Sequence, residues 1–122
     1  MAQSPADSAA IARWRSLRFG MVLHWGPVSL TGGEIGWSRG NPTPIPTYDA
    51  LYRKFDPQGF DADAWVSIAK AAGMKYLVIT AKHHDGFCLW PSEHTDYDIG
   101  ETPYERDVVG ELAAACRKQD LA

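Results

Sequence analysis

The stretch Asp61-Ala-Asp-Ala-Trp-Val-Ser-Ile-Ala-Lys-Ala-Ala-Gly-Met-Lys-Tyr-Leu-Val-Ile-Thr80 joins a helical pattern to a strand pattern, with only Gly73 and Met74 at the junction. Its first half predicts a helix, because apolar residues recur at three- and four-residue steps and can face a sheet with one stripe. These residues are Ala62, Trp65, Ile68, Ala69 and Ala72. Asp61 is predicted to cap this helix and Gly73 to end it.

The second half, Lys75-Tyr-Leu-Val-Ile-Thr80, is rich in β-branched residues and almost continuously apolar. Such a run predicts a strand that is buried on both faces, as strands of parallel sheets are. Upstream, Arg18-Phe-Gly-Met-Val-Leu-His24 has the length of a strand, ends at a polar residue and predicts the first strand. A second helix is predicted after its cap Asp107, with an apolar stripe made of Val108, Val109, Leu112, Ala115 and Cys116.

Two long segments rich in glycine and proline follow the strands, from Trp25 to about Phe60 and from Ala81 to Asp107. The order strand, loop, helix, strand, loop, helix predicts a parallel pair joined by a right-handed crossover. Long loops after strands and short returns after helices are typical of an α/β barrel whose site lies at the carboxyl ends of its strands.

A complete barrel of this kind needs ~250 residues, whereas this chain has 122. The predicted fold class is therefore α/β, an N-terminal fragment of a (β/α)8 TIM-like barrel with two βα units. We expect residues 1–12 to form a flexible N-terminal tail that runs into a short helix at Ile11 to Leu17. Residues 13–122 are expected to form the partial catalytic barrel, the rest of which is absent. Two strands cannot close a barrel, so apolar surface should be exposed on their helix-free side.

The composition is that of a folded globular chain, with 45% hydrophobic and 22% charged residues. The net charge is −3 and no run of Lys or Arg occurs, which argues against nucleic acid and against an anionic membrane surface as partners. No segment is long and apolar enough to span a bilayer, and residues 1–12 show no secretory signal. The localisation is left unknown: the sequence as written fits a cytoplasmic protein, and a secreted or periplasmic location stays open if the N-terminus is incomplete. It does not predict the oligomeric state.

Cys88 and Cys116 are the two cysteines of the chain. Cys116 falls on the apolar stripe of the second helix, and Cys88 lies in an apolar loop. Two reduced, buried thiols are the preferred interpretation over a disulfide.

Three short clusters fall where a barrel would place its site. His24-Trp25-Gly26 ends the first strand, Gly33-Glu34-Ile35-Gly36-Trp37 lies in the first loop, and Lys82-His83-His84-Asp85-Gly86-Phe87 follows the second strand. Two adjacent imidazoles at the end of an apolar strand are hard to explain by burial alone, so His83 and His84 are predicted to be functional. Both can face the barrel axis only if the chain bends, which Gly86 allows. For His24, packing and function are equally favoured.

The remaining polar residues of these loops are open to two interpretations. Glu34, between glycines and aromatic residues, slightly favours binding of hydroxyl groups over a solvated charge, and Trp37 fits either a binding face or loop core. Asp85 could brace a histidine or the turn. Asp96 and Asp98 are predicted to be loop-forming residues.

Imidazoles, a carboxylate and indole faces suit a small ligand with many hydroxyl groups. The same kinds of side chain suit a metal ion, so a metal-dependent barrel hydrolase that uses His24, His83, His84 and Asp85 is an alternative.

Several segments of the chain, in this order, resemble glycoside hydrolase family 29, the α-L-fucosidases. Among them are Arg18-Phe-Gly-Met-Val-Leu-His-Trp-Gly26, Gly33-Glu-Ile-Gly-Trp-Ser-Arg-Gly40, Ala72-Gly-Met-Lys-Tyr76 and Thr80-Ala-Lys-His-His-Asp-Gly-Phe-Cys-Leu-Trp90. The strong signal is Lys82-His-His-Asp-Gly-Phe87 following Gly73-Met-Lys-Tyr-Leu-Val-Ile-Thr80, in this order after Phe19-Gly-Met-Val-Leu-His-Trp-Gly26. Shorter matches are Tyr48-Asp-Ala-Leu-Tyr52, Phe60-Asp-Ala-Asp-Ala-Trp65, Thr95-Asp-Tyr-Asp-Ile99 and Arg106-Asp-Val-Val109. The resemblance covers the chain from about Arg13 onward.

This resemblance implies a retaining exo-hydrolase that releases terminal α-L-fucose from glycans or glycosides, without a metal or an organic cofactor. It implies that His24, His83 and His84 bind the sugar. Glu34 and Trp37 lie where the family places a further carboxylate and indole, although some members have the two adjacent.

The resemblance also implies that the nucleophile and the acid/base, ~5 Å apart in retaining enzymes, lie downstream of this chain. The chain has no catalytic residue of its own by this reading and should be inactive in isolation. A non-catalytic carbohydrate-binding fragment is the remaining alternative.

Overall fold

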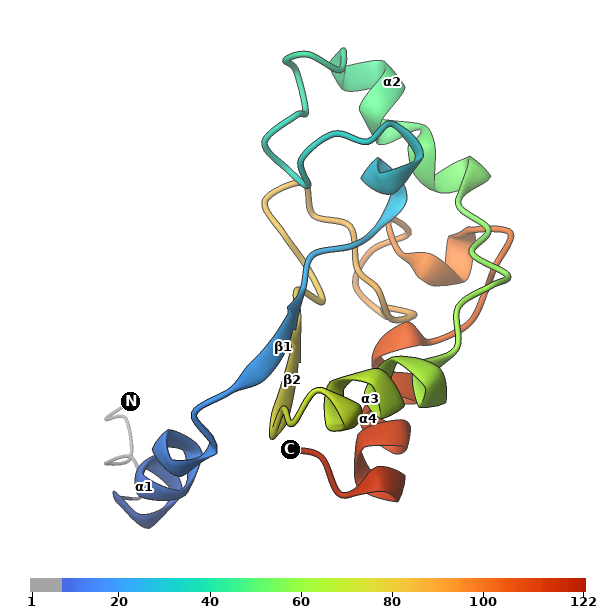
Figure 1. Ribbon diagram of the computed structural model, residues 1–122. Helices are drawn as coiled ribbons and strands as arrows, with labels where there is room; N and C mark the ends of the chain where they lie inside the picture. The colour runs from blue at the N-terminus through green and yellow to red at the C-terminus, as the bar shows by residue number, and fades with distance from the viewer. Residues whose placement is uncertain (1–7) are drawn as a thin grey trace.

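A computed structural model describes residues 8–122 of the chain. Along the chain the elements are α1 (Ser8–Leu17), β1 (Gly20–Leu23), η1 (Pro27–Leu30), α2 (Ile45–Asp49), η2 (Leu51–Lys54), α3 (Ala62–Ala71), β2 (Tyr76–Ile79), η3 (Ile99–Glu101) and α4 (Val108–Gln119), as Figure 1 shows. The predicted α/β class is confirmed, with both strands and both principal helices in the predicted order.

The two strands are parallel and in register, with Gly20 opposite Tyr76 and Leu23 opposite Ile79. They are shorter than predicted, but backbone hydrogen bonds continue beyond their ends. The amide of Thr80 donates to the carbonyl of Leu23 (3.0 Å), so the paired segment reaches the residue before the second long loop. The long loops that follow β1 and β2 therefore leave from the same edge of the sheet.

Both predicted helix caps are present. The Asp61 carboxylate accepts a hydrogen bond from the amide of Ala64 (2.9 Å), and the Asp107 carboxylate accepts one from the amide of Gly110 (2.8 Å). Gly73 follows α3 with φ of 81°, the left-handed conformation that ends many helices. These local signals were sufficient to place the helices, because a cap satisfies backbone groups within one turn.

Helices α3 and α4 pack against each other and cover one face of the strand pair (Figure 1). Val66 on α3 is fully buried, and Leu112 on α4 is 2% exposed. The α4 stripe is confirmed, but the α3 stripe is corrected at Ile68, which is 61% exposed, and at Ala72, which is also exposed. Ile68 lies about 120° around the helix from Ala62, so the buried face follows Val66 and Ala69 instead.

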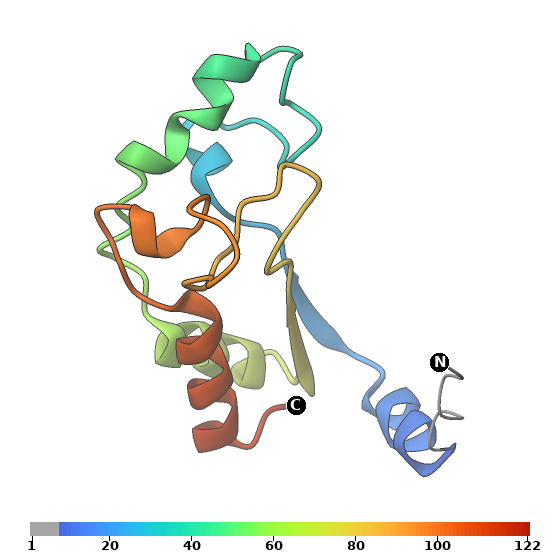
Figure 2. The ribbon, with the colours of Figure 1, turned by 180° about the vertical axis from the view of Figure 1, so that it is seen from behind.

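The other face of the strand pair is bare. Val22 on β1 is 67% exposed, and its neighbour Val78 on β2 is 46% exposed. The prediction that β2 is buried on both faces is therefore wrong for this chain, because α3 and α4 both lie on one side (Figure 2). The expectation of exposed apolar surface on the helix-free side is confirmed.

The last residue continues the sheet pattern beside β2. The carbonyl of Ala122 accepts from the amide of Leu77 (2.8 Å), and the amide of Ala122 donates to the carbonyl of Lys75 (3.2 Å). A residue of a parallel strand makes this pair of bonds with the two residues that flank its partner. Ala122 therefore stands where the first residue of a third parallel strand would stand.

Helix α1 begins at Ser8, three residues before the predicted Ile11. Residues 8–12 of the expected tail are thus helical, because this segment contains alanines with high helix propensity; the flexibility expected of residues 1–7 lies outside the described part. The helix projects from the body and contains no buried residue, and Trp14 is 61% exposed (Figures 1 and 2). Within residues 8–122, no helix has the length and apolar character needed to cross a membrane.

Cys88 and Cys116 are both free thiols, as preferred from the sequence. Cys88 is buried and Cys116 is half-buried, and burial raises the pKa of each thiol.

Candidate functional site

Three imidazoles converge at the carboxyl ends of the two strands. His24 follows β1 directly, and its ring centre lies 5.4 Å from that of His83, which follows β2. The rings of His83 and His84 are 4.8 Å apart and nearly perpendicular. Nδ1 of His24 lies 2.6 Å from the hydroxyl oxygen of Thr80, so the two strand ends are also joined by a hydrogen bond. The convergence expected for these histidines is confirmed.

A tight turn after β2 brings both adjacent histidines to this place. The amide of Gly86 donates to the carbonyl of His83 (3.0 Å), and Gly86 has φ of 87°. Because this turn ends the extended conformation, His83 and His84 need not point to opposite faces. The bend predicted at Gly86 is therefore confirmed.

The first long loop adds an indole to the cluster. The Trp37 ring centre lies 4.9 Å from that of His84 and 6.0 Å from that of His83. Its side chain is 65% exposed, so it is not part of a loop core. An exposed indole beside imidazoles can cover the apolar face of a ligand while the rings bind its polar groups.

Glu34 lies on the same loop, with its side chain exposed. Its backbone carbonyl accepts from the amide (3.1 Å) and the hydroxyl (2.7 Å) of Ser38, which holds the turn toward Trp37. Among residues 8–122, no hydrogen bond or ion pair holds the Glu34 carboxylate. The carboxylate is therefore free to bind a further group.

Gly36 forms a wall for the His83 ring. It has φ of 72°, and a Cβ built on it would lie 2.2 Å from Nδ1 of His83, so any side chain there would force the His83 ring to shift. Nδ1 of His83 is buried and has no hydrogen-bond partner among residues 8–122. The ring nitrogen that remains for a ligand is Nε2.

Tyr48 connects the two loops, and the sequence patterns did not single it out for the site. It is 1% exposed. Its hydroxyl donates to Oδ2 of Asp85 (2.7 Å) and accepts from the amide of Gly36 (2.8 Å). Oδ1 of Asp85 accepts from the amide of Phe87 (3.2 Å), so Asp85 braces the turn after β2. Burial and the hydrogen bond to Asp85 raise the pKa of Tyr48 to about 12, so it remains a donor at neutral pH.

Asp98 has the structural role expected from the sequence. It is 4% exposed, and its carboxylate accepts from the amides of Ser92 (2.8 Å) and Gly100 (2.7 Å). It therefore shapes the second loop and does not face a ligand. Asp96 is exposed.

His24, His83, His84 and Asp85, the residues considered for a metal site, do not converge on one point as metal ligands would. Within the described residues, no three His, Cys, Asp or Glu side chains lie close enough to hold one metal ion. Asp85 is directed toward Tyr48 and the amide of Phe87.

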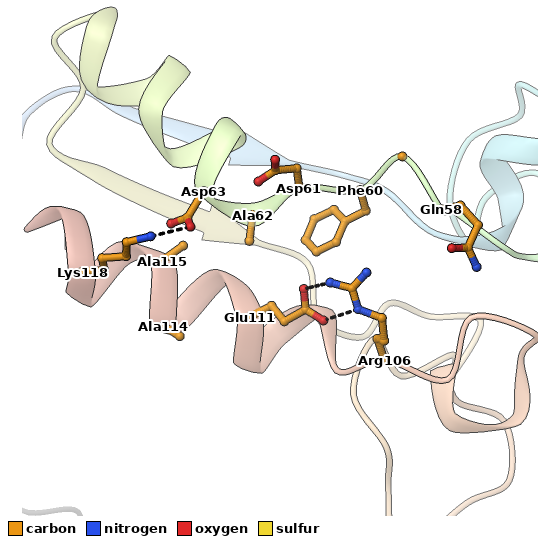
Figure 3. Close-up of a pocket in the computed structure, with 11 residues that line it drawn as sticks. Gln58, Phe60, Asp61, Ala62, Asp63, Arg106, Glu111, Ala114, Ala115 and Lys118 are labelled. Atoms are coloured by element: carbon orange, nitrogen blue, oxygen red, sulfur yellow. Dashed lines mark hydrogen bonds and ion pairs between the residues drawn. The ribbon is translucent and has the colours of Figure 1, made fainter.

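A separate hollow of about 620 Å³ lies between α3 and α4 (Figure 3). Its charged side chains are largely paired with each other, Arg106 with Glu111 and Lys118 with Asp63. None of the histidines or loop residues described above lines it. The described features that combine imidazoles, an indole and a free carboxylate thus lie at the strand ends.

Known proteins resemble this chain over nearly its whole length. A family described as α-L-fucosidase matches residues 2–122. Among relatives, α-L-fucosidase 1 of Arabidopsis thaliana is 39% identical over 96% of this chain, and tissue α-L-fucosidase of Homo sapiens is 32% identical over 94%. The chain spans 22% and 28% of those two proteins.

Solved structures show the same fold. A GH29 α-L-fucosidase from Bacteroides thetaiotaomicron, trapped as a covalent intermediate with 2-fluoro-fucosyl fluoride, matches 99% of this chain with a TM-score of 0.85 and 34% identity, over 30% of its own length. An α-L-fucosidase from Lactobacillus casei in complex with α-L-fucose matches 91% with a TM-score of 0.82 and 39% identity, over 38% of its own length. The match in sequence and in structure extends through both strands and both loops that carry the histidines, and the chain belongs to the α-L-fucosidase family.

Proposed function

We propose that this chain forms the first two βα units of a (β/α)8 barrel in a retaining α-L-fucosidase, and that its strand-end loops bind the fucose. The observation that carries this proposal is the convergence of His24, His83, His84 and Trp37 at the carboxyl ends of β1 and β2. That end is where barrel enzymes hold their substrates.

Two features of the sheet, together with the length of the relatives, support the barrel. One face of the strand pair is covered by helices, as on the outside of a barrel, while Val22 and Val78 leave the other face apolar and exposed. The hydrogen bonds of Ala122 to β2 have the pattern of a further parallel strand. The chain also spans only 22–38% of the fucosidases cited above.

In the proposed pocket the imidazoles bind sugar hydroxyls, because a neutral imidazole has one donor and one acceptor. For His83 the contact is made through Nε2, since Nδ1 is enclosed by Gly36. Trp37 covers the apolar face of the sugar ring, and the free carboxylate of Glu34 accepts a hydrogen bond from a hydroxyl group.

Retaining hydrolysis uses two carboxylates ~5 Å apart, one as nucleophile and one as acid/base. In this proposal both come from the part of the barrel that follows this chain. Residues 8–122 contribute binding energy instead, and part of it increases as the sugar becomes oxocarbenium-like in the transition state.

The proposal is tested in the complete enzyme, meaning this chain continued through the rest of the barrel. The continuation comes from the downstream coding sequence or, if there is none, from the Lactobacillus casei relative. His83→Ala and His84→Ala should each lower kcat/KM for an aryl α-L-fucoside about tenfold, because each loses a hydrogen bond that strengthens in the transition state. His94→Ala is the matched control, since His94 is exposed and has no ring contact with the cluster.

Hydrolysis should continue in the presence of a chelator, because the two-carboxylate mechanism requires no metal. An enzyme that cleaves α-L-fucosides equally well without both histidines would contradict the pocket. Loss of activity on chelation, with recovery on addition of zinc, would support the metal-dependent alternative instead.

A further inference from the structure

Two loops build the proposed sugar site, and one buried side chain ties them together. The loop after β1 contributes Gly36 and Trp37, and the turn after β2 contributes His83 and Asp85. Between them, the Tyr48 hydroxyl accepts from the Gly36 amide at 2.8 Å and donates to Asp85 at 2.7 Å. These bonds bridge 12 and 37 residues of sequence, respectively.

The two hydrogen bonds of the Tyr48 hydroxyl also fix the surroundings of the His83 ring. Gly36 is packed against the His83 ring so closely that a Cβ would lie 2.2 Å from Nδ1. Asp85 lies two residues after His83 and fixes the same turn through the amide of Phe87. Tyr48 thus holds Gly36, which lies against the His83 ring, and it also holds the backbone turn from which His83 projects.

We propose that Tyr48 is a positioning residue for His83, and that it acts by holding Gly36 against the imidazole. The inference rests on the proposed function for its activity readout, but the geometry stands independently of it. Tyr48 itself is 1% exposed, so it has almost no surface with which to contact a sugar. Its effect on hydrolysis is therefore indirect and passes through Gly36 and through the turn that Asp85 holds.

Tyr48→Phe tests the hydroxyl alone, because the ring keeps its place in the core. The substitution leaves the Gly36 amide without its acceptor and Oδ2 of Asp85 without its donor, so the two loops can separate. In the complete enzyme, kcat/KM for an aryl α-L-fucoside should fall about tenfold, as for a lost hydrogen bond to a charged group.

The same substitution in a His83→Ala background distinguishes positioning from general destabilisation. If Tyr48 acts through His83, removing its hydroxyl should change kcat/KM less than about twofold once the imidazole is absent, since coupled residues are not additive. An equal loss in both backgrounds would overturn the proposal, and so would no loss in either.

Tyr104→Phe is the matched control. Tyr104 is 4% exposed, and its hydroxyl is buried without a hydrogen-bond partner among residues 8–122. Tyr104→Phe therefore removes a buried tyrosine oxygen without breaking a hydrogen bond between the described residues. Activity should remain within about twofold of the parent enzyme.

A second readout does not depend on activity. In the complete enzyme, hydrogen exchange at the Gly36 amide should be at least about tenfold faster in Tyr48→Phe, and the ring resonances of His83 should shift. If the enzyme proves inactive on fucosides but both signals change, the proposed function fails while the positioning role stands. Unchanged exchange and an unchanged His83 signal would overturn the positioning role, whatever the activity.

Discussion

The two faces of the β1–β2 pair have opposite environments although they belong to the same eight residues. On one face, Leu77 packs against the buried cluster that includes Val66 on α3 and Leu112 on α4. On the other, Val22 and Val78 are exposed, and the row continues to His24 and Thr80 at the carboxyl end. The covered face stabilises this chain, whereas the bare face leads to the proposed sugar site.

This difference separates stability from function along one sheet. Substitutions under the helices should act on folding and leave the chemistry of the histidines unchanged. Substitutions at the end of the bare face should act on the site with smaller effects on folding. Four predictions test this division, in order of decreasing expected effect.

Leu112→Ala should have the largest effect, because Leu112 is 2% exposed and its truncation leaves a cavity between α4 and the sheet. We expect a loss of about 2–5 kcal/mol in the free energy of unfolding, measured by urea denaturation of the complete enzyme. Ala113→Ser, at an exposed position of the same helix, should change it by less than about 0.5 kcal/mol. A loss at Leu112 no greater than at Ala113 would contradict the covered face as the source of stability.

Gly36→Ala should affect both stability and site. The new methyl group meets His83 and the φ of 72° is unfavourable, so we expect about 1–3 kcal/mol of destabilisation and a fall in kcat/KM. Gly32→Ala isolates the steric part, because Gly32 has φ of 69° but nothing within 4 Å of its Cβ position. If thermal unfolding and hydrolysis respond equally to both substitutions, Gly36 does not act as a wall for His83.

Tyr48 should make stability depend on pH in the alkaline range. Its pKa is raised from 10.0 to about 12, so the folded state retains the proton that the unfolded state loses. This contribution is fully present below pH 10 and is lost as the pH rises toward 12. Between pH 9 and 11, the free energy of unfolding of the parent enzyme should fall by about 1 kcal/mol more than that of the Tyr48→Phe variant.

The other tyrosines with raised pKa values, Tyr97 and Tyr104, remain in both proteins, so the difference between the two denaturation curves reports mainly Tyr48, with a smaller part from its effect on the pKa of Tyr97. An identical pH dependence would mean that the phenol is not enclosed.

Substitutions on the bare face should have the smallest effect on the isolated chain. Val22→Thr with Val78→Thr should change its stability by less than about 0.5 kcal/mol, because both side chains are already exposed. The parent chain should bind an apolar fluorescent dye, and the double substitution should reduce that fluorescence. A parent chain that binds no dye, or a double variant that binds as much dye as the parent chain, would contradict the bare face.

Much of the fold could be predicted from local patterns. The caps at Asp61 and Asp107 and the terminator Gly73 act within one helical turn, so a short window of sequence contains the whole interaction. The apolar strands and the long loops after them predicted the parallel pair, and the polar residues at the strand ends predicted where the histidines meet. His24, His83 and His84 were found because strand direction alone places them at one edge.

Tertiary structure decided which faces are buried and how the site is braced. Ile68 and Val66 are both apolar residues of α3, and only the packing of α4 determines that Val66 is buried. The periodicity of strands (two residues) and of helices (3.6 residues) does not predict that Tyr48 contacts Gly36 and Asp85. These contacts depend on the path of two long loops. The sequence by itself determined the elements and their direction, through local hydrogen bonding and periodicity. Contacts between distant segments of the chain decided that Gly36 lies against His83, that Tyr48 joins the two loops, and which face of the sheet the helices cover.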